Sequence, residues 1–212
     1  MQQPTFSIGK SISEAWQIFK EKWQVILGLA IAGFLIQYVP AQIVGPYDGS
    51  TQSAFYFVMQ LVMMVLNFLV AMVWIHAYIK LSRREEITIE SIKSILPLAP
   101  KYLAGVLLTG LIVVVGLILF IIPGLYFALK YAYVPYLIID KEMGPLEAMR
   151  ASAKITDGVK GNLFVLMLAL VGINILGLLA LVVGIVVTSA VSAIASALVY
   201  TQLAKRLKSD AV

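Results

Sequence analysis

Long apolar stretches separated by short polar segments dominate the chain. Three of these stretches, residues 23–79, 102–139 and 161–204, contain only two charged residues between them, Asp48 and Lys130. A helix rises about 1.5 Å per residue, and the hydrocarbon core of a bilayer is about 30 Å thick. Each stretch is therefore much longer than one crossing requires and has to turn back within itself. The pattern predicts three helical hairpins, which together make six membrane spans.

Turn signals inside the stretches set the expected boundaries. The run Gly45-Pro46-Tyr47-Asp48-Gly49-Ser50 predicts the turn of the first hairpin, and Pro123-Gly124 predicts that of the second, because proline and glycine end a helix. No polar loop marks the third turn, and Gly177 and Gly184 both qualify for it. The expected spans are residues 24–44, 54–80, 102–122, 124–140, 162–182 and 185–205.

Three shorter amphipathic segments precede the hairpins, at residues 9–23, 88–96 and 145–156. Their apolar stripes are Ile12, Ala15, Trp16, Phe19 and Trp23 in the first, Ile89, Ile92 and Leu96 in the second, and Leu146, Met149 and Ala153 in the third. Thr88 is suited to the N-cap of the second helix. We expect these helices to lie on the cytoplasmic membrane surface. The order predicts a unit of surface helix and hairpin repeated three times, although any protein with an even number of spans also acquires such helices.

The predicted fold class is all-α: a polytopic membrane helical bundle of one domain, residues 1–212, with six transmembrane helices and three amphipathic cytoplasmic-surface helices. Backbone groups in lipid must be hydrogen-bonded within the structure, and the alternation typical of a membrane β-barrel is absent from the sequence. Composition agrees, since 61% of the residues are hydrophobic and 13% are charged, against about 45–50% and 25% in soluble domains.

The basic residues fix the expected orientation. All of the 16 lysines and arginines except Lys130 fall in four clusters that flank the hairpins. Loops rich in lysine and arginine stay in the cytoplasm, so both termini are expected there. The net charge of +5 then reflects membrane topology. Because there is no basic soluble domain, we expect no nucleic-acid partner.

The sequence offers little for catalysis. It has one histidine, His76, and no cysteine, and its carboxylates lie outside the spans or, at Asp140, at the very end of one. A zinc site needs about four nitrogen or sulfur ligands, and a proton relay needs membrane carboxylates. No phosphate-binding loop or nucleophile elbow is present. We therefore expect no enzyme activity, no catalytic residue, no metal and no cofactor, and we interpret His76 as a packing residue.

Polar side chains within the spans are the candidate binding residues. Asn67 and Asn174 lie at mid-span, where amides bond across helices or contact a substrate. Lys130 lies about seven residues beyond Pro123-Gly124, about 10 Å below the outer surface at about 1.5 Å per residue. Tyr126 and Tyr133 fall on its helical face, where they could hold the ammonium by cation–π contact or hydrogen bonds. Lys130 either snorkels or bonds to carbonyls freed near Pro135, or it forms an anion site for a lipid phosphate or small solute.

Small residues recur at four-residue spacing in the last span. Ser189, Ala193 and Ala197 form one such row, and Ser192 and Ser196 form another. Rows of this kind let helices pack closely in lipid, either within one chain or between two copies.

One segment resembles a known membrane family. Its residues are Pro123-Gly124-Leu125-Tyr126, Lys130, Val134-Pro135-Tyr136-Leu137-Ile138-Ile139-Asp140, Gly144-Pro145-Leu146-Glu147-Ala148, Ser152 and Gly158. The segment resembles the membrane domain found beside glycerophosphoryl diester phosphodiesterases, and related prokaryotic six-helix inner-membrane proteins. The resemblance implies six helices in the cytoplasmic membrane and no catalysis, since the phosphodiesterase chemistry belongs to a separate soluble domain.

The sequence thus predicts a non-enzymatic accessory or lipid-interacting membrane module. The alternative is a small transporter or permease for an anionic or amphipathic solute. The ligand-binding hypothesis rests on Lys130, Tyr126, Tyr133, Asn67 and Asn174. The expected partners are membrane lipids, together with a membrane-protein partner or a second copy of the chain.

Overall fold

The computed structural model describes residues 6–44 and 53–209, and within these ranges it contains helices and turns but no strand. The turn predicted at residues 45–50 lies outside the described residues. The helices are α1 (Ile8–Val44), α2 (Ser53–Ser82), α3 (Ile89–Ile95), a 3-10 turn η1 (Leu96–Leu98), α4 (Ala99–Leu119), α5 (Ile121–Lys130), α6 (Val134–Lys141), α7 (Pro145–Ile155), α8 (Lys160–Leu179), α9 (Leu181–Leu203) and α10 (Arg206–Ser209). Six helical segments in this part of the chain are long and apolar enough to cross a membrane. The predicted fold class is confirmed.

The first surface helix and the first span form one helix with a kink. α1 runs without interruption past the predicted boundary at residues 23 and 24, and Lys22 carries the only non-helical dihedral angles within it (φ −118°, ψ 20°). The second surface helix begins as predicted, because the Thr88 hydroxyl accepts a hydrogen bond from the Ser91 amide at 3.2 Å.

The turn of the second hairpin lies earlier than predicted. Phe120 is extended (φ −160°, ψ 145°) and α5 begins at Ile121, so Pro123-Gly124 is not the turn. Pro123 lies in the first turn of α5, where a missing amide N–H breaks no helical bond. Gly124 serves packing instead, because a Cβ on Gly116 would lie 2.9 Å from the Gly124 Cα.

The predicted fourth span, residues 124–140, is divided into two short helices. α5 ends at Lys130, residues 131–133 form a turn, and α6 begins at Val134. Pro135 explains the break, since it lies in the first turn of α6, has no N–H to donate to the Tyr131 carbonyl and disfavours a helical residue before it.

The third hairpin turns at Ala180, between α8 and α9, and not at either candidate glycine. The predicted spans 162–182 and 185–205 are therefore shifted by two to four residues. Gly177 and Gly184 lie against each other across the turn, where a Cβ on Gly177 would come within 2.9 Å of the Gly184 carbonyl oxygen. Because the two glycines have no side chains, the helices can approach closely there, and the chain reverses at Ala180.

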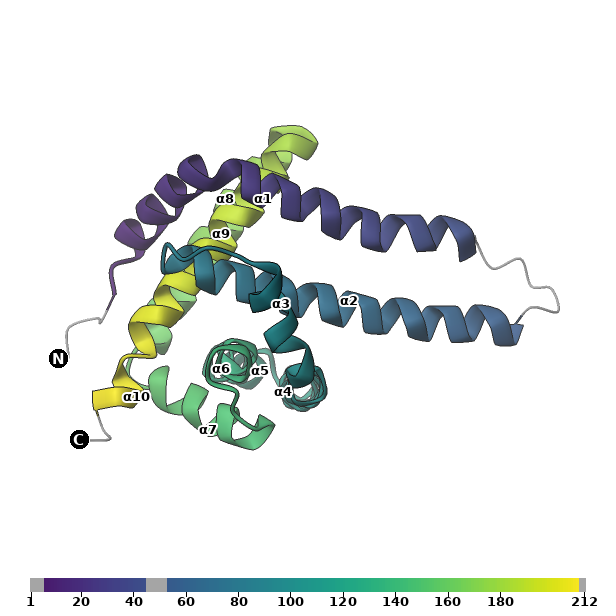
Figure 1. Ribbon diagram of the computed structural model, residues 1–212. Coiled ribbons are helices and arrows are strands. Elements are labelled where there is room, and N and C mark those ends of the chain that lie inside the picture. Colours follow the sequence, from purple (N-terminus) through teal and green to yellow (C-terminus); the bar gives the residue numbers. More distant parts are fainter. Residues whose placement is uncertain (1–5, 45–52, 210–212) are drawn as a thin grey trace.

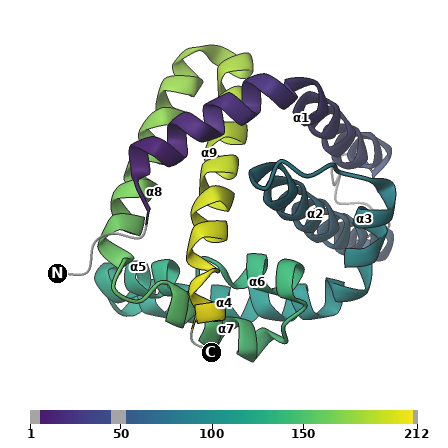
Figure 2. The same cartoon turned by 60° about the vertical axis from the view of Figure 1, so that its left-hand side comes forward.

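The hairpins diverge from a shared core that we call the hub (Figures 1 and 2). In Figure 1, α1 and α2 run side by side across the view, α8 and α9 cross it steeply, and α4 and α6 are seen almost along their axes. The hub is the buried cluster that includes Met72 and Ile79 of α2, Tyr102 of α4, Val134, Leu137, Ile138 and Ile139 of α6, Ile155 of α7, and Tyr200 and Leu203 of α9. α6 lies at its centre, since it packs against α2, α4 and α7.

α7 buries the predicted stripe only in part, since Met149 belongs to the hub but Leu146 does not. Ala148, Ser152 and Ile155 are fully buried, whereas Leu146 of the predicted stripe is 62% exposed. Besides Met149 and Ile155, the buried face holds small and polar side chains, which a search for large apolar residues overlooks.

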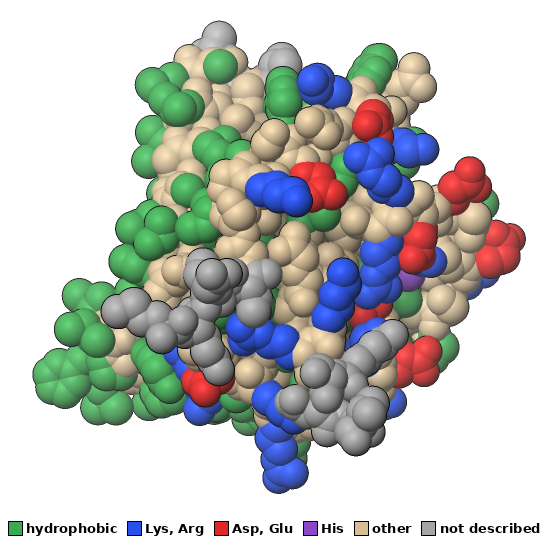
Figure 3. Space-filling model, turned by 90° about the vertical axis from the view of Figure 1, so that its left-hand side faces the viewer, with side chains coloured by type: hydrophobic (Ala, Val, Ile, Leu, Met, Phe, Trp, Pro, Cys, Tyr) green, Lys and Arg blue, Asp and Glu red, His purple; other side chains and the backbone are tan. Residues whose placement is uncertain are grey.

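Charged side chains gather on one face of the molecule. Figure 3 looks at the side on which α10 and the start of α1 lie in Figure 1, and most of the lysine and arginine side chains visible there form one broad band. By contrast, the hairpin tip formed by α4 and α5 exposes Ile118, Ile121 and Ile122 almost completely. This separation of charged and apolar ends suits a protein that crosses a membrane.

Candidate functional site

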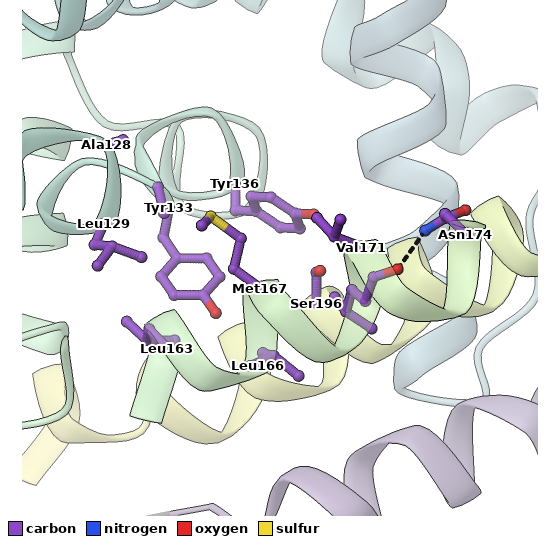
Figure 4. Close-up of a pocket in the computed structure, with 12 residues that line it drawn as sticks. Ala128, Leu129, Tyr133, Tyr136, Leu163, Leu166, Met167, Val171, Asn174 and Ser196 are labelled. Atoms are coloured by element: carbon purple, nitrogen blue, oxygen red, sulfur yellow. Dashed lines mark hydrogen bonds between the residues drawn. The ribbon is translucent and has the colours of Figure 1, made fainter. Parts of the chain in front are cut away.

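An apolar groove lies between the α5–α6 segment and the third hairpin. Its volume is about 320 Å³, at the lower end of the usual range for ligand pockets. The lining residues are Ala128, Leu129, Ala132, Tyr133, Tyr136, Leu163, Leu166, Met167, Leu170, Val171, Asn174 and Ser196. Figure 4 shows Tyr133 and Tyr136 on one side, with Met167 reaching between them from α8. Nearly all of the wall is hydrocarbon or aromatic ring.

The break between α5 and α6 positions the two tyrosines, and α7 holds the break in place. The Ser152 hydroxyl donates to the Lys130 carbonyl at 2.8 Å and accepts from the Tyr133 amide at 3.3 Å. The Thr156 hydroxyl lies 3.3 Å from the same carbonyl and 2.8 Å from the Ser152 carbonyl. Ser152 and Thr156 are completely buried, so they supply partners to backbone groups that water cannot reach.

The far end of the groove is closed by a bond between helices. The Asn174 amide donates to the Ser192 hydroxyl of α9 and to the Leu170 carbonyl of its own helix, each at 2.8 Å. The second bond is the dashed line in Figure 4. The Ser196 hydroxyl donates to the Ser192 carbonyl at 2.9 Å. Asn174 thus bonds across helices, which is one of the two roles considered for it.

A cluster of three aromatic rings connects the groove to the hub. The ring centroids of Tyr133, Tyr136 and Tyr200 lie 5.2–5.8 Å apart in all three pairs, a range typical of favourable aromatic contacts. The Tyr200 hydroxyl then donates to Asp140 Oδ2 at 2.8 Å. Tyr133 and Tyr136 of the groove wall therefore contact Tyr200, which is hydrogen-bonded to a buried polar centre.

Asp140, which was not among the residues predicted for the site, is that centre. Its carboxylate is 6% exposed and pairs with Arg83 through Nη1–Oδ1 at 2.6 Å and Nη2–Oδ2 at 2.8 Å, with Lys141 3.3 Å away. The hydrogen bond to Asp140 raises the pKa of Arg83 above its ordinary value, although partial burial opposes the rise. The bonds to Arg83 and Tyr200 join α2, α6 and α9. A carboxylate directly after the run Leu137-Ile138-Ile139 was the available signal.

The structure separates the five residues of the ligand-binding hypothesis. Tyr133 and Asn174 line the groove. Lys130 is half-buried outside it, with Nζ 5.3 Å from the ring centroid of Tyr131. The Tyr126 ring faces the Lys160 ammonium instead, also at 5.3 Å. The break after Lys130 explains the difference, because it ends the helical spacing that would have placed Tyr133 beside Lys130.

Asn67 and His76 lie on α2, outside the groove. The exposed Asn67 amide donates to the Met63 carbonyl of its own helix at 2.8 Å. His76 is 9% exposed, as expected of a packing residue, and its Nε2 has no hydrogen-bond partner in the described part of the chain. Within that part, no three histidine, aspartate or glutamate side chains are grouped as metal ligands.

Comparison with known proteins places the chain among membrane proteins. Residues 51–207 match the family described as "Protein of unknown function (DUF975)". The chain belongs to this family. The DUF975 match covers α2 to α9, which build the groove and nearly all of the hub. It supports a prokaryotic membrane family of unknown function, and neither it nor the relative below supports the resemblance to the membrane domain of glycerophosphoryl diester phosphodiesterases.

A stretch of 59 residues of this DUF975 protein is 34% identical to the UPF0259 membrane protein SG1383 of Sodalis glossinidius (strain morsitans). The match covers 28% of this chain and 24% of that protein, so it spans about a quarter of the relative's length. No solved structure matches the chain.

Proposed function

We propose that this protein is a non-enzymatic, lipid-interacting accessory module of the prokaryotic cytoplasmic membrane, and that its groove holds an acyl chain of a membrane lipid. The observation that carries the proposal is the groove between α5–α6 and α8–α9. Its walls are mostly apolar, and its polar groups are the hydroxyls of Tyr133 and Tyr136 and, at one end, the side chains of Asn174 and Ser196. Such a surface favours a hydrocarbon chain over a charged or strongly hydrated ligand.

The hydrogen bonds of Asn174 and Ser196 favour a lipid ligand over a transported solute. Asn174 is bonded to Ser192 and Leu170, and Ser196 is bonded to Ser192. A solute that replaced its hydration shell with these groups would first have to break bonds within the protein. Lys130, the residue best suited to attract an anion, does not line the groove.

The proposed orientation rests on the band of basic side chains. With this face in the cytoplasm, both termini are cytoplasmic and the three hairpin turns face outward. The positive-inside rule supports this choice, because the hairpin stretches carry a single basic residue, Lys130.

Two tryptophan substitutions on neighbouring residues of α8 test the proposal. Met167 lines the groove, whereas Leu168 is 51% exposed and does not line it. We expect gently purified wild-type protein and Leu168→Trp to retain lipid in native mass spectrometry. Met167→Trp fills the groove and should lose most of the retained lipid while keeping its helical circular dichroism. Equal lipid retention by Met167→Trp and Leu168→Trp would refute the groove as the binding site.

A further inference from the structure

A second pocket lies on the charged face and is unlike the groove in character. It is bounded by the start of α1, the start of α8 and the end of α9, and its volume is about 850 Å³. Its lining residues are Phe6, Ser7, Ile8, Gly9, Lys10, Ser11, Glu14, Asn162, Gln202 and Lys205. Ammonium, amide and hydroxyl groups from three helices therefore converge on one pocket.

The first turn of α1 adds backbone donors to this pocket. The first amide N–H groups of a helix have no acceptor within the helix, and they favour an anion. Ile8, Gly9 and Lys10 of that turn line the pocket. α1 runs from Ile8 to its kink at Lys22 without a break, and this length provides an N-terminal dipole, whose effect acts within the first turn.

Ser11 gives a second and independent indication of a ligand. Its side chain is 1% exposed and lines the pocket, and its hydroxyl has no hydrogen-bond partner among the described residues. A buried hydroxyl without a partner is destabilising, because it has lost its hydrogen bonds to water. An acceptor oxygen that entered the pocket beside Ser11 would remove that cost.

We propose that this pocket binds a singly charged phosphate group, such as a phosphodiester. Lys10 and Lys205 supply two positive charges, while Glu14 supplies one negative charge. The net charge of the side chains is thus +1, which matches a monoanion better than a phosphate monoester dianion. Asn162 and Gln202 can donate to the phosphate oxygens. The phosphate belongs either to a lipid headgroup or to a soluble ester, since both present the same group.

Binding is tested with two probes on the purified full-length protein. A soluble phosphodiester, dimethyl phosphate, is titrated in detergent, with chloride at equal ionic strength as the reference. Nanodiscs of phosphatidylcholine with and without phosphatidylglycerol supply the lipid form. We expect thermal stabilisation by dimethyl phosphate or by phosphatidylglycerol, beyond the effect of chloride or phosphatidylcholine. A response to the soluble ester identifies a soluble ligand, and a response confined to phosphatidylglycerol identifies a headgroup. No response to either probe overturns the proposal.

Matched variants locate the response. Lys10→Gln with Lys205→Gln removes both ammonium groups and should weaken binding at least about tenfold, since hydrogen bonds to charged groups are the strong ones. Lys20→Gln with Lys93→Gln changes the net charge equally at exposed residues outside the pocket and should bind like wild type. An equal loss in both double variants would mean attraction to the whole face and would overturn the site.

Two further variants probe the pocket without removing its positive charge. A Cβ on Gly9 meets no atom within 4 Å, so Gly9→Leu should fold and reduce binding by occupying the space. Glu14→Gln raises the side-chain charge to +2 and should improve binding of a monoester dianion, tested with methyl phosphate, at least threefold. Wild-type binding by Gly9→Leu, or unchanged selectivity in Glu14→Gln, contradicts the proposal. The Met167→Trp variant should leave this pocket unaffected, so the test of the groove and the test of this pocket can fail separately.

Discussion

The ion pair between Arg83 and Asp140 should be a principal source of stability, and a double-mutant cycle measures its contribution. The changes are Asp140→Asn, which keeps the shape and an acceptor for Tyr200, and Arg83→Met, which keeps the stem. Two nitrogen–oxygen contacts of 2.6 and 2.8 Å join the charges, and Asp140 is 6% exposed. Two unit charges about 4 Å apart attract by about 4 kcal/mol at an effective dielectric constant of about 20.

Partial exposure reduces this figure. The Arg83 side chain is 32% exposed, so solvent screens part of the attraction. We expect each single change to lower the free energy of unfolding by about 3 kcal/mol, because it leaves one charge without its partner. The double variant should lose less than the sum, with a coupling energy of about 2 kcal/mol.

Reversible unfolding by sodium dodecyl sulfate in mixed micelles provides the measurement. The control is Lys80→Met, which removes the Lys80–Glu85 pair, whose side chains are 28% and 43% exposed. That change should cost less than about 1 kcal/mol. A coupling energy below about 0.5 kcal/mol between Arg83 and Asp140 would show that the pair does not hold α2 to α6, and the reasoning from burial would be wrong.

Three other predictions follow from single contacts. Gly177→Ala should lower the free energy of unfolding by about 2 kcal/mol, because its Cβ meets the Gly184 carbonyl. Gly172→Ala in the same helix has open space and should raise the free energy of unfolding by up to about 1 kcal/mol. Micelle unfolding that ranks the two variants in the reverse order would contradict the packing at the turn. Ser152→Ala should lower the free energy of unfolding by about 2 kcal/mol and speed hydrogen exchange at the Tyr133 amide, since two backbone groups lose a partner. Wild-type exchange at that amide would argue against the role of Ser152 in holding the helix break. The hydrogen bond from Lys160 lowers the pKa of Asp157 below its ordinary value of 3.8. The contribution of this bond to stability is therefore present at neutral pH and is lost as the pH falls below 3.8. In thermal melts at pH 3 and pH 7, Asp157→Asn should lack this part of the loss of stability in acid.

Hydropathy predicted the helices well because the length and apolarity of a span are local properties. The three hairpins and the N-cap at Thr88 required only the residues that form them. The exact turns were harder. Pro123 and Gly124 are common turn residues, but here the first begins a helix and the second packs against Gly116. A local signal cannot distinguish a glycine that turns the chain from one that lets two helices approach.

The candidate site depended on contacts distant in sequence. Asn174 was found because an amide within a span needs a partner, and the partner is Ser192. Asp140 was overlooked because its partners, Arg83 and Tyr200, are 57 and 60 residues away. The division of the fourth span was also missed, although Pro135 marked it, because the helix break is stabilised by Ser152 in a later helix.

The central place of α6 has a consequence for how the protein is made. During synthesis α6 emerges before α7 and α9, which supply the Ser152 hydroxyl and the Tyr200 hydroxyl. The two helices of each hairpin can insert into the membrane together. The hydrogen bonds of Asp140 and of the end of α5 are complete only when α7 and α9 are also present. Until then, the Asp140 carboxylate lacks its bond from Tyr200, and the Lys130 carbonyl and the Tyr133 amide lack their bonds to Ser152. Folding of the centre is therefore completed only after α9 has been synthesised, because Tyr200 supplies a partner of Asp140 that the earlier helices lack.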